Sequence, residues 1–369
     1  MQAVSDTTKK GRAGKSKAME ELTALLALSR VSKIDNVRKK RLAEGHVSVA
    51  SLFEGREKAE NAADNGAIHA FREFGKIDAD LALLSRMGAT VLTIKDTDYP
   101  PRLKAIPDAP LVLYRKGPLP LAHDALAVVG ARKASFEGML LAEEIADALS
   151  SAGITVVSGL ARGIDASAHK GALHGKGGTV GVLGCGIDRC YPAENWTLFQ
   201  GIGGAGALLT EYGPGVPPWK GHFPARNRII AGLSAGVLVV EASQKSGSLI
   251  TARLALDYGR EVMAIPGRVF DDAHKGANSL IKQGALLVED INDILACCFP
   301  HMELQRKSAI DMDGDEDYIY TLLGPERLHV DELIGKSGFE ARKVMAVLTR
   351  LEMKDMVRPV PGGFYLRKG

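Results

Sequence analysis

Cysteine is scarce in this chain of 369 residues. The four cysteines are Cys185, Cys190, Cys297 and Cys298, none of which forms a CxxC pair or lies near a cluster of histidines. Structural zinc sites need closely spaced Cys and His ligands, so we expect no metal. So few cysteines in a chain of this length also indicate a reducing compartment.

Apolar runs long enough to span a membrane are missing as well. A transmembrane helix needs about 18 consecutive apolar residues, and no stretch approaches that length. Residues 1–20 are polar and basic without an apolar segment, so we expect neither a signal peptide nor a membrane anchor there. The expected location is the cytoplasm.

The chain also lacks a strong net charge. Its 47 Lys and Arg residues nearly balance 44 Asp and Glu residues, which leaves a net charge of +3. Any nucleic-acid site must therefore come from local clustering of cations. Glycine, by contrast, is abundant at 41 residues. Many of these glycines lie between apolar runs, where tight turns or the close approach of a ligand require them.

The composition of the sequence and the spacing of its apolar residues divide the chain into five segments. They are a disordered basic tail (1–18), a small helical domain (19–88), an α/β domain (89–300), an acidic linker (301–316) and a winged-helix domain (317–369). The helices expected in the second and fifth segments are Val37–Leu42, Val49–Phe53, Ile68–Phe74, Tyr318–Leu323, Val330–Leu333 and Ala341–Lys354. A hairpin after the last helix completes the pattern of a winged helix.

Short apolar runs alternate with helix-length segments in the α/β domain. Continuous apolar strands separated by helices indicate a sheet covered on both faces. We therefore predict an extended Rossmann-like, doubly wound, mostly parallel sheet. The predicted strands are Val91–Ile94, Leu126–Val129, Ile154–Val157, Val180–Leu183, Leu208–Thr210, Val237–Val240, Val262–Ile265 and Leu286–Val288.

Ligands of doubly wound sheets bind at the carboxyl ends of the strands, and glycine-bearing segments follow several strands here. Gly130, Arg132 and Lys133 come directly after one of them. Gly130 allows a sharp turn, and we expect the next helix to point its first N–H groups at an anion. The two cations add positive charge at the same place.

A second segment, from Ser158 to Lys170, follows the next predicted strand. It carries Arg162, and Lys170 lies about one and a half turns into the helix that we expect to begin at Asp165, within reach of a phosphate. We interpret Asp165 as a helix N-cap and His169 as a packed side chain, because no nucleophile stands beside them.

A third segment, from Lys245 to Ser248, opens a helix after the strand Val237–Val240. Ser246, Gly247 and Ser248 combine small hydroxyl groups with a glycine, which is typical of a nest that binds anions.

A basic and aromatic segment precedes that strand. We expect Phe223 to stack on a base and Arg226 and Arg228 to act as paired donors to phosphates. Together, the segments place sites of phosphate size along one edge of the sheet.

One glycine motif is rejected. Gly201, Gly203 and Gly206 spell GxGxxG, but they follow a predicted helix and precede a strand. A dinucleotide-binding loop requires the opposite order. No Walker lysine loop occurs either, so no cofactor is expected.

At this point the sequence resembles the DNA-processing protein A family, also called DprA or Smf. The resemblance covers residues 89–290. It rests on Tyr99-Pro100, Gly130-Ala131-Arg132, Ser158-Gly159 with Asp165 and His169, Gly184-Cys185-Gly186, Tyr191-Pro192, Asn195, Phe223-Pro224, Arg226-Asn227-Arg228, Lys245 to Ala252 and Pro266-Gly267.

The resemblance implies a non-catalytic protein that binds single-stranded DNA, forms a homodimer through its Rossmann domain and loads RecA during DNA uptake or recombination. Single-strand-binding protein is a further partner that it suggests. The phosphate-binding positions of the family correspond to Arg132, Lys170, Arg226, Asn227, Ser246 and Gly247.

The outer domains resemble those of the family less closely. The N-terminal helices are similar to a sterile-alpha-motif-like domain, but residues 32–36 lack the glycines of a DNA-binding helix-hairpin-helix. The C-terminal domain resembles the winged helix of the family, called DML1. Basic residues in its third helix are mixed with acidic ones, so duplex binding there is a weaker hypothesis.

Two other functions remain open. A Rossmann-type nucleotide hydrolase, similar to phosphoribohydrolases, would use Glu241 beside the loop from Ser246 to Thr251. Release of free base from nucleoside monophosphates would identify it. A transcription regulator would use the winged helix, and duplex binding that depends on Ala341–Lys354 would identify that function.

Overall fold

The computed structural model describes residues 21–121, 124–302, 312–324, 327–354 and 356–367. The chain divides into two compact units, residues 1–303 and 304–369, which are considered separately. The predicted basic tail and most of the predicted acidic linker lie outside the described residues. Within the described ranges no helix has the length and apolar character needed to cross a bilayer.

A nine-stranded sheet forms the centre of the first unit, in the order β1-β2-β6-β5-β4-β3-β7-β8-β9. Its strands are β1 (Ala89–Thr93), β2 (Val112–Lys116), β3 (Ala125–Val129), β4 (Thr155–Ser158), β5 (Thr179–Val182), β6 (Ala207–Thr210), β7 (Gly236–Val239), β8 (Glu261–Ala264) and β9 (Leu286–Leu287). The seven strands from β3 to β9 pair in parallel, which confirms the predicted doubly wound, mostly parallel sheet.

Strand β2 was not predicted. It pairs antiparallel with β1 on one side and with β6 on the other. Two features explain why the sequence did not predict it. Its partner β6 lies far along the chain, and the expected alternation of strands with helices has no second strand so soon after β1. Pairing with β1 on one side and with the distant β6 on the other therefore defines this strand.

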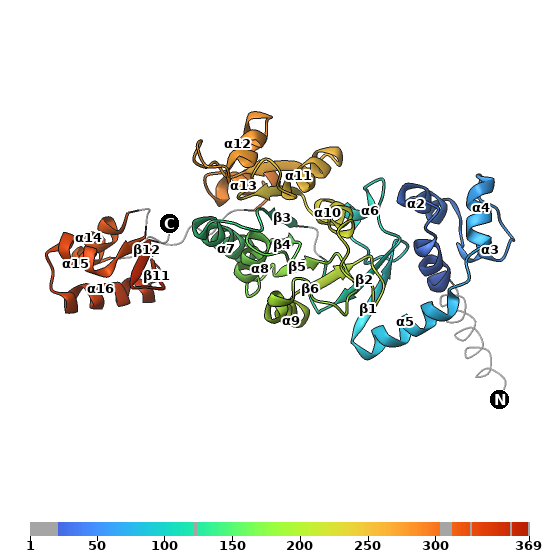
Figure 1. The fold of residues 1–369 in the computed structure, drawn as a ribbon, viewed down its shortest axis with the longest axis horizontal. Coiled ribbons are helices and arrows are strands. Elements are labelled where there is room, and N and C mark those ends of the chain that lie inside the picture. The colour runs from blue at the N-terminus through green and yellow to red at the C-terminus, as the bar shows by residue number, and fades with distance from the viewer. Residues whose placement is uncertain (1–20, 122–123, 303–311, 325–326, 355, 368–369) are drawn as a thin grey trace. The chain divides into compact units, whose positions relative to one another are not determined.

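Helices cover both faces of the sheet (Figure 1). They are α6 (Pro101–Lys104), α7 (Phe136–Ser151), α8 (Ile164–Ala172), α9 (Trp196–Ala205), α10 (His222–Leu233), α11 (Ser248–Asp257), α12 (Lys275–Lys282) and α13 (Ile291–Cys298). α7 packs beside α8 and α8 beside α9, whereas α10 packs beside α11. Every residue of β3 is buried, as a strand between two helical layers requires. The rejected GxGxxG lies at the end of α9 and just before β6, in the order that the sequence indicated.

The chain order reverses between β3 and β7. From β3 the chain proceeds through β4, β5 and β6 on one side, and then returns to place β7 on the other side of β3. The parallel register pairs Val129 with Val239, so the carboxyl ends of β3 and β7 lie next to each other. Doubly wound sheets bind their ligands in the crevice at such a switch point.

Helices precede the sheet, as predicted. They are a helix over residues 21–30, α2 (Asn36–Gly45), α3 (Ala50–Phe53), α4 (Ala62–His69) and α5 (Phe74–Arg86). The predicted helix Ile68–Phe74 is wrong, because α4 ends at His69 and α5 begins at Phe74. The ring of Phe71, between the two helices, packs edge-on against Phe53 and Phe74, and this aromatic contact fixes the turn.

A buried charged network ties α10 to the segments that follow α6 and β6. The Arg228 guanidinium lies 2.5 Å from a Glu211 oxygen and 3.5 Å from an Asp108 oxygen. Burial raises the pKa of Glu211, and the nearby Arg228 and Lys39 oppose that rise. Arg228 is therefore a structural cation that holds α10 against the rest of the unit.

The second unit is a winged helix, as predicted. It consists of α14 (Gly314–Leu323), β10 (Leu328–His329), α15 (Val330–Ser337), α16 (Ala341–Met353), β11 (Val357–Val360) and β12 (Phe364–Arg367), with the sheet order β10-β12-β11. The predicted linker needs a correction, because α14 begins at Gly314. The Asp313 side chain accepts from the Glu316 N–H and Glu316 accepts from the Asp313 N–H, so this acidic stretch caps the helix.

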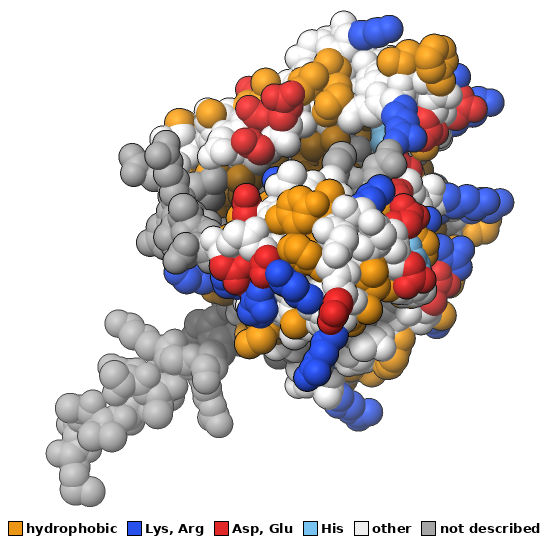
Figure 2. Space-filling model, turned by 90° about the vertical axis from the view of Figure 1, so that its left-hand side faces the viewer, with side chains coloured by type: hydrophobic (Ala, Val, Ile, Leu, Met, Phe, Trp, Pro, Cys, Tyr) orange, Lys and Arg blue, Asp and Glu red, His pale blue; other side chains and the backbone are white. Residues whose placement is uncertain are grey.

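Charges of both signs are mixed on the molecular surface. On the face drawn in Figure 2, Lys and Arg side chains are interspersed with Asp and Glu side chains and form no broad basic field. This distribution agrees with the small net charge of +3. A site for a polyanion must therefore be local.

We expect Arg228→Ala to lower the free energy of unfolding by about 3–5 kcal/mol, because it leaves the Glu211 carboxylate buried without its partner. Urea unfolding of the variant measures this change. The double variant Arg228→Met with Glu211→Leu removes both charges and should recover most of the loss. An unchanged unfolding midpoint for Arg228→Ala would show that the network contributes little.

Candidate functional site

A cavity of about 650 Å³ opens where the carboxyl ends of β3 and β7 meet. The residues after β3, the loop after β7 and the first turn of α10 provide most of its lining. This is the position that the switch in strand order predicts for a ligand.

Gly130 allows the two strand ends to approach. A Cβ atom on it would lie 2.5 Å from Ile164 Cγ1 and 2.9 Å from the Glu241 carbonyl oxygen, so no side chain fits. The next residue, Ala131, donates its N–H to that same carbonyl oxygen at 2.7 Å. Gly163, which faces the Ala131 carbonyl, has a φ of 69° that favours glycine. Both glycines therefore serve close backbone packing.

The first turn of α7 does not present a free anion site, contrary to our expectation. Its N-cap, Ser135, donates both its N–H and its hydroxyl to the buried Glu241 carboxylate, with distances of 3.1 Å and 2.7 Å. The protein thus supplies its own anion at this helix end. Glu241 is an anchor between β7 and α7.

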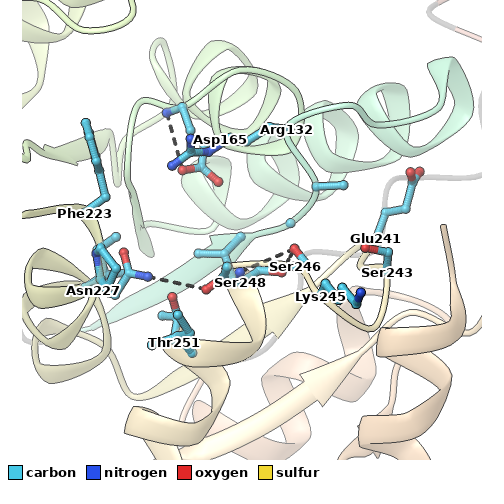
Figure 3. A pocket seen from close by; sticks show the side chains of 18 of the residues that line it. Arg132, Asp165, Phe223, Asn227, Glu241, Ser243, Lys245, Ser246, Ser248 and Thr251 are labelled. Carbon is cyan, nitrogen blue, oxygen red and sulfur yellow. Dashed lines mark hydrogen bonds between the residues drawn. The ribbon is translucent and has the colours of Figure 1, made fainter. Parts of the chain in front are cut away.

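The loop before α11 remains open to a ligand. The Ser246 N–H donates to the Ser243 carbonyl oxygen, and the hydroxyls of Ser246 and Ser248 lie 2.7 Å apart. Gly247 is exposed, and a Cβ atom there would meet nothing within 4 Å. Figure 3 shows Asn227 of α10 reaching across the cavity to this loop, where its amide lies 3.5 Å from the Gly247 carbonyl oxygen.

An aromatic pair borders the cavity. The ring of Phe223, in the first turn of α10, lies 5.2 Å from the ring of Tyr191, with an angle of 37° between their planes. The Arg132 guanidinium lies 5.5 Å from the centre of the Phe223 ring. Tyr191 is well exposed. This arrangement combines a surface for stacking with an adjacent cation.

Arg226 lines the cavity wall, but its guanidinium is buried. It donates to the carbonyl oxygens of Gly159, at 2.7 Å, and of Val182. Burial lowers its pKa to about 10, so it stays protonated at neutral pH. Its role is to tie α10 to the ends of β4 and β5 and to add positive potential to the wall.

Asp165 is not the helix N-cap that we expected, because Gly163 takes that position in α8. The buried Asp165 carboxylate instead accepts from the N–H groups of Gly159, at 3.1 Å, and Ala161, at 3.4 Å. Burial raises its pKa, and the nearby Arg226 opposes the rise. Asp165 therefore shapes the loop after β4.

His169 is a packed side chain, as predicted. It is fully buried, accepts from the Leu160 N–H at 3.3 Å and lies 2.7 Å from the Thr179 hydroxyl. Burial, together with the charge of Arg226, lowers its pKa to about 3. The imidazole is neutral at physiological pH and does not face the cavity.

The structure brings ten of the thirteen predicted site residues to the cavity. They are Gly130, Arg132, Lys133, Phe223, Arg226, Asn227, Lys245, Ser246, Gly247 and Ser248. Arg162 lines a smaller adjoining cleft instead. Lys170 is exposed in α8 and Arg228 is buried in the charged network, and neither contributes to the lining.

Tyr191 and Lys220 also line the cavity, and neither was predicted to do so. The Tyr191-Pro192 motif contributed to the family resemblance without being assigned a role. Lys220 carried no signal of its own, because a single lysine before a helix is ordinary.

Positive charge prevails in the cavity. Arg132, Lys133, Lys220, Arg226 and Lys245 line it, against the buried acidic side chains of Asp165 and Glu241. Among the described residues, no three His, Cys, Asp or Glu side chains converge as metal ligands would. The arrangement can bind phosphate oxygens and stack an aromatic base.

The comparisons with known proteins point to one family. The family model for DNA recombination-mediator protein A matches residues 90–298, and the model for the DprA winged helix domain matches residues 304–363. Protein Smf of Escherichia coli is 37% identical over 78% of this chain and 80% of its own length. The DNA processing protein DprA of Streptococcus pneumoniae is 47% identical over 55% of this chain and 72% of its own length.

Two solved structures are similar to this chain. That of DprA from Streptococcus pneumoniae aligns with a TM-score of 0.62 and 38% identity, covering 77% of this chain and 98% of the other. That of DNA processing protein A from Helicobacter pylori, a protein described as having a unique single-stranded DNA binding mode, aligns with a TM-score of 0.53 and 29% identity, covering 58% of this chain and 97% of the other.

We expect Glu241→Gln to lower the free energy of unfolding by about 1.5–3 kcal/mol, because an amide cannot accept all the hydrogen bonds that Ser135 donates. Thermal unfolding measures the loss. Glu137→Gln, a neutralisation at an exposed site in the first turn of the same helix, is the matched control and should change stability little. Equal effects of the two variants would refute the anchoring role.

Proposed function

The chain belongs to the DNA recombination-mediator protein A family, and on that premise we propose that it binds single-stranded DNA in the cavity between β3 and β7 without reacting with it. The observation that carries the proposal is the lining itself, because five cations and an aromatic pair line one cavity at the switch point of the sheet.

The chemistry of the lining favours a single strand. The cavity is lined by Arg132, Lys220 and Lys245. Their positive charge attracts phosphates, which are the same in every DNA sequence. Phe223 and Tyr191 offer ring faces, which only an unpaired base can reach. Such a site binds with little base preference. The single-stranded DNA binding mode described for the Helicobacter pylori protein supports the same class of ligand.

We propose further that the protein protects incoming single strands and loads RecA on them during DNA uptake or natural transformation, with single-strand-binding protein as a second partner. Membership of the family supports these roles. A cytoplasmic location and a homodimer formed through the Rossmann domain belong to the same proposal.

A nucleotide hydrolase is less well supported. That function would need Glu241 as a free carboxylate beside the substrate, but the Glu241 side chain is buried and accepts from Ser135. His169 is neutral and turned toward Thr179. Neither group is placed to move a proton in the cavity.

A transcription regulator that binds duplex DNA through α16 is also less well supported. Lys343 donates to Asp315 at 2.8 Å, and Arg350 and Lys354 donate to Glu316 at 3.0 and 2.6 Å. Hydrogen bonding from Lys354 lowers the Glu316 pKa to about 2, so Glu316 is ionised at neutral pH and can pair with Arg350 and Lys354. The helix therefore offers duplex phosphates little unpaired charge.

We expect Arg132→Ala to weaken binding of single-stranded DNA and to flatten its salt dependence by about 0.7 on a log–log plot, because one phosphate contact is lost. Phe223→Ala should weaken binding by about 1–3 kcal/mol and leave the slope nearly unchanged, since a ring displaces no counterions. Fluorescence anisotropy across several salt concentrations measures both variants.

Lys170→Ala is the matched control for Arg132→Ala, because it removes an exposed cation outside the cavity. It should leave the slope close to that of the unsubstituted protein. If Lys170→Ala flattened the salt dependence as much as Arg132→Ala does, the strand would bind outside the cavity. A flattened salt dependence for Phe223→Ala would lead to the same conclusion.

The test of the proposed function is a titration with single-stranded and duplex oligonucleotides of one sequence. We expect the single strand to bind more tightly by at least about tenfold, or 1.4 kcal/mol. Removal of residues 304–369, a separate compact unit, should preserve this preference because the cavity lies wholly in the first unit. Tighter duplex binding by the full chain would refute the proposal.

A further inference from the structure

A second, smaller cleft adjoins the main cavity. Five residues line both, namely Arg132, Ala161, Tyr191, Phe223 and Arg226. The aromatic pair of Tyr191 and Phe223 therefore stands between the two depressions. Only the smaller cleft is lined by Arg162 and Pro192.

Arg162 is engaged by a carboxylate of the protein itself. Its Nε and Nη2 atoms donate to the two carboxylate oxygens of Glu194, the second of these bonds measuring 2.6 Å. Glu194 follows closely after Tyr191 and Pro192, in the short helix η1 (Ala193–Asn195). The pair thus lies at the end of the cleft that is formed by the segment carrying Tyr191.

The ion pair is solvent-exposed on both sides. The Arg162 and Glu194 side chains are 61% and 52% exposed. Exposed pairs are weak because water competes with each partner. A phosphodiester offers a guanidinium the same two-oxygen geometry as a carboxylate, so it can replace Glu194 without any rearrangement of the buried core.

We propose that the smaller cleft is a second phosphate subsite for the strand that leaves the main cavity across the aromatic pair, with Glu194 occupying Arg162 until the strand arrives. This inference rests on the proposed function, since it concerns the same bound strand. Glu194 then lowers the affinity of the protein for DNA strands that are long enough to cross the aromatic pair. Strands that fill only the main cavity are unaffected.

The experiment measures the affinity of the full chain for oligothymidylates of roughly three and roughly twelve nucleotides. The unsubstituted protein is compared with Glu194→Gln, Arg162→Ala and the double variant. We expect Glu194→Gln to bind the longer probe about two- to fivefold more tightly and the shorter probe equally well. In the Arg162→Ala background the gain from Glu194→Gln should fall by at least about half, because no masked cation remains to be released.

Glu137→Gln controls for the general effect of removing a negative charge, because Glu137 is exposed and is not paired with Arg162. Three results would show that Glu194 merely repels DNA by its charge, and each would overturn the proposal. They are an equal gain in affinity for Glu137→Gln, an equal gain of Glu194→Gln for the short probe, and an undiminished gain of Glu194→Gln in the Arg162→Ala background. The absence of any gain would also overturn it. If the unsubstituted protein fails to bind either probe, the proposed function itself is wrong.

Discussion

The parallel pairing of β3 with β7 is the constraint on which the rest of the site depends. It places Gly130 and Glu241 side by side just beyond the strand ends, where the Ala131 N–H donates to the Glu241 carbonyl oxygen. The Glu241 side chain continues the same connection by accepting from Ser135 at the start of α7. One acidic residue therefore joins two strands and a helix, and the cavity is the space left in front of that junction. Because the Glu241 carboxylate accepts from Ser135 in this way, it is not free to act as a base in the cavity.

Three arginines of the first unit have two different roles, and the role of each depends on whether its side chain is buried. Arg226 and Arg228 are buried and bind carbonyl or carboxylate oxygens of the protein, so they hold α10 in place. Arg132 is exposed beside an aromatic ring and can exchange water for a phosphate at little cost. A buried cation that already has partners would lose them on binding a ligand, whereas an exposed one loses only solvent. The buried arginines therefore stabilise the position of α10, and exposed cations such as Arg132 keep their charge for solvent or a ligand.

The two units divide their charges differently. In the first unit cations collect around one cavity, whereas in the winged helix the acidic start of α14 pairs with the cations of α16. The capping role of Asp313 and Glu316 explains why acids stand there, since a helix N-terminus favours negative charge. The same acids then neutralise Arg350 and Lys354. Helix capping and the pairing of cations on α16 thus follow from one short acidic stretch.

The sequence by itself determined the fold class, eight of the nine strands and four of the five cations that line the cavity, because buried parallel strands read as apolar runs and glycines mark the turns that follow them. It assigned Arg226 and Arg228 to phosphates, although both are buried and bind oxygen atoms of the protein itself. It also gave no sign of Lys220 or of strand β2, whose surroundings are assembled from distant segments. Tertiary structure decided which cations are exposed to solvent and which pair with carboxylates. The sequence cannot distinguish the two, because a lysine or arginine has the same chemistry until the folded chain brings a partner beside it.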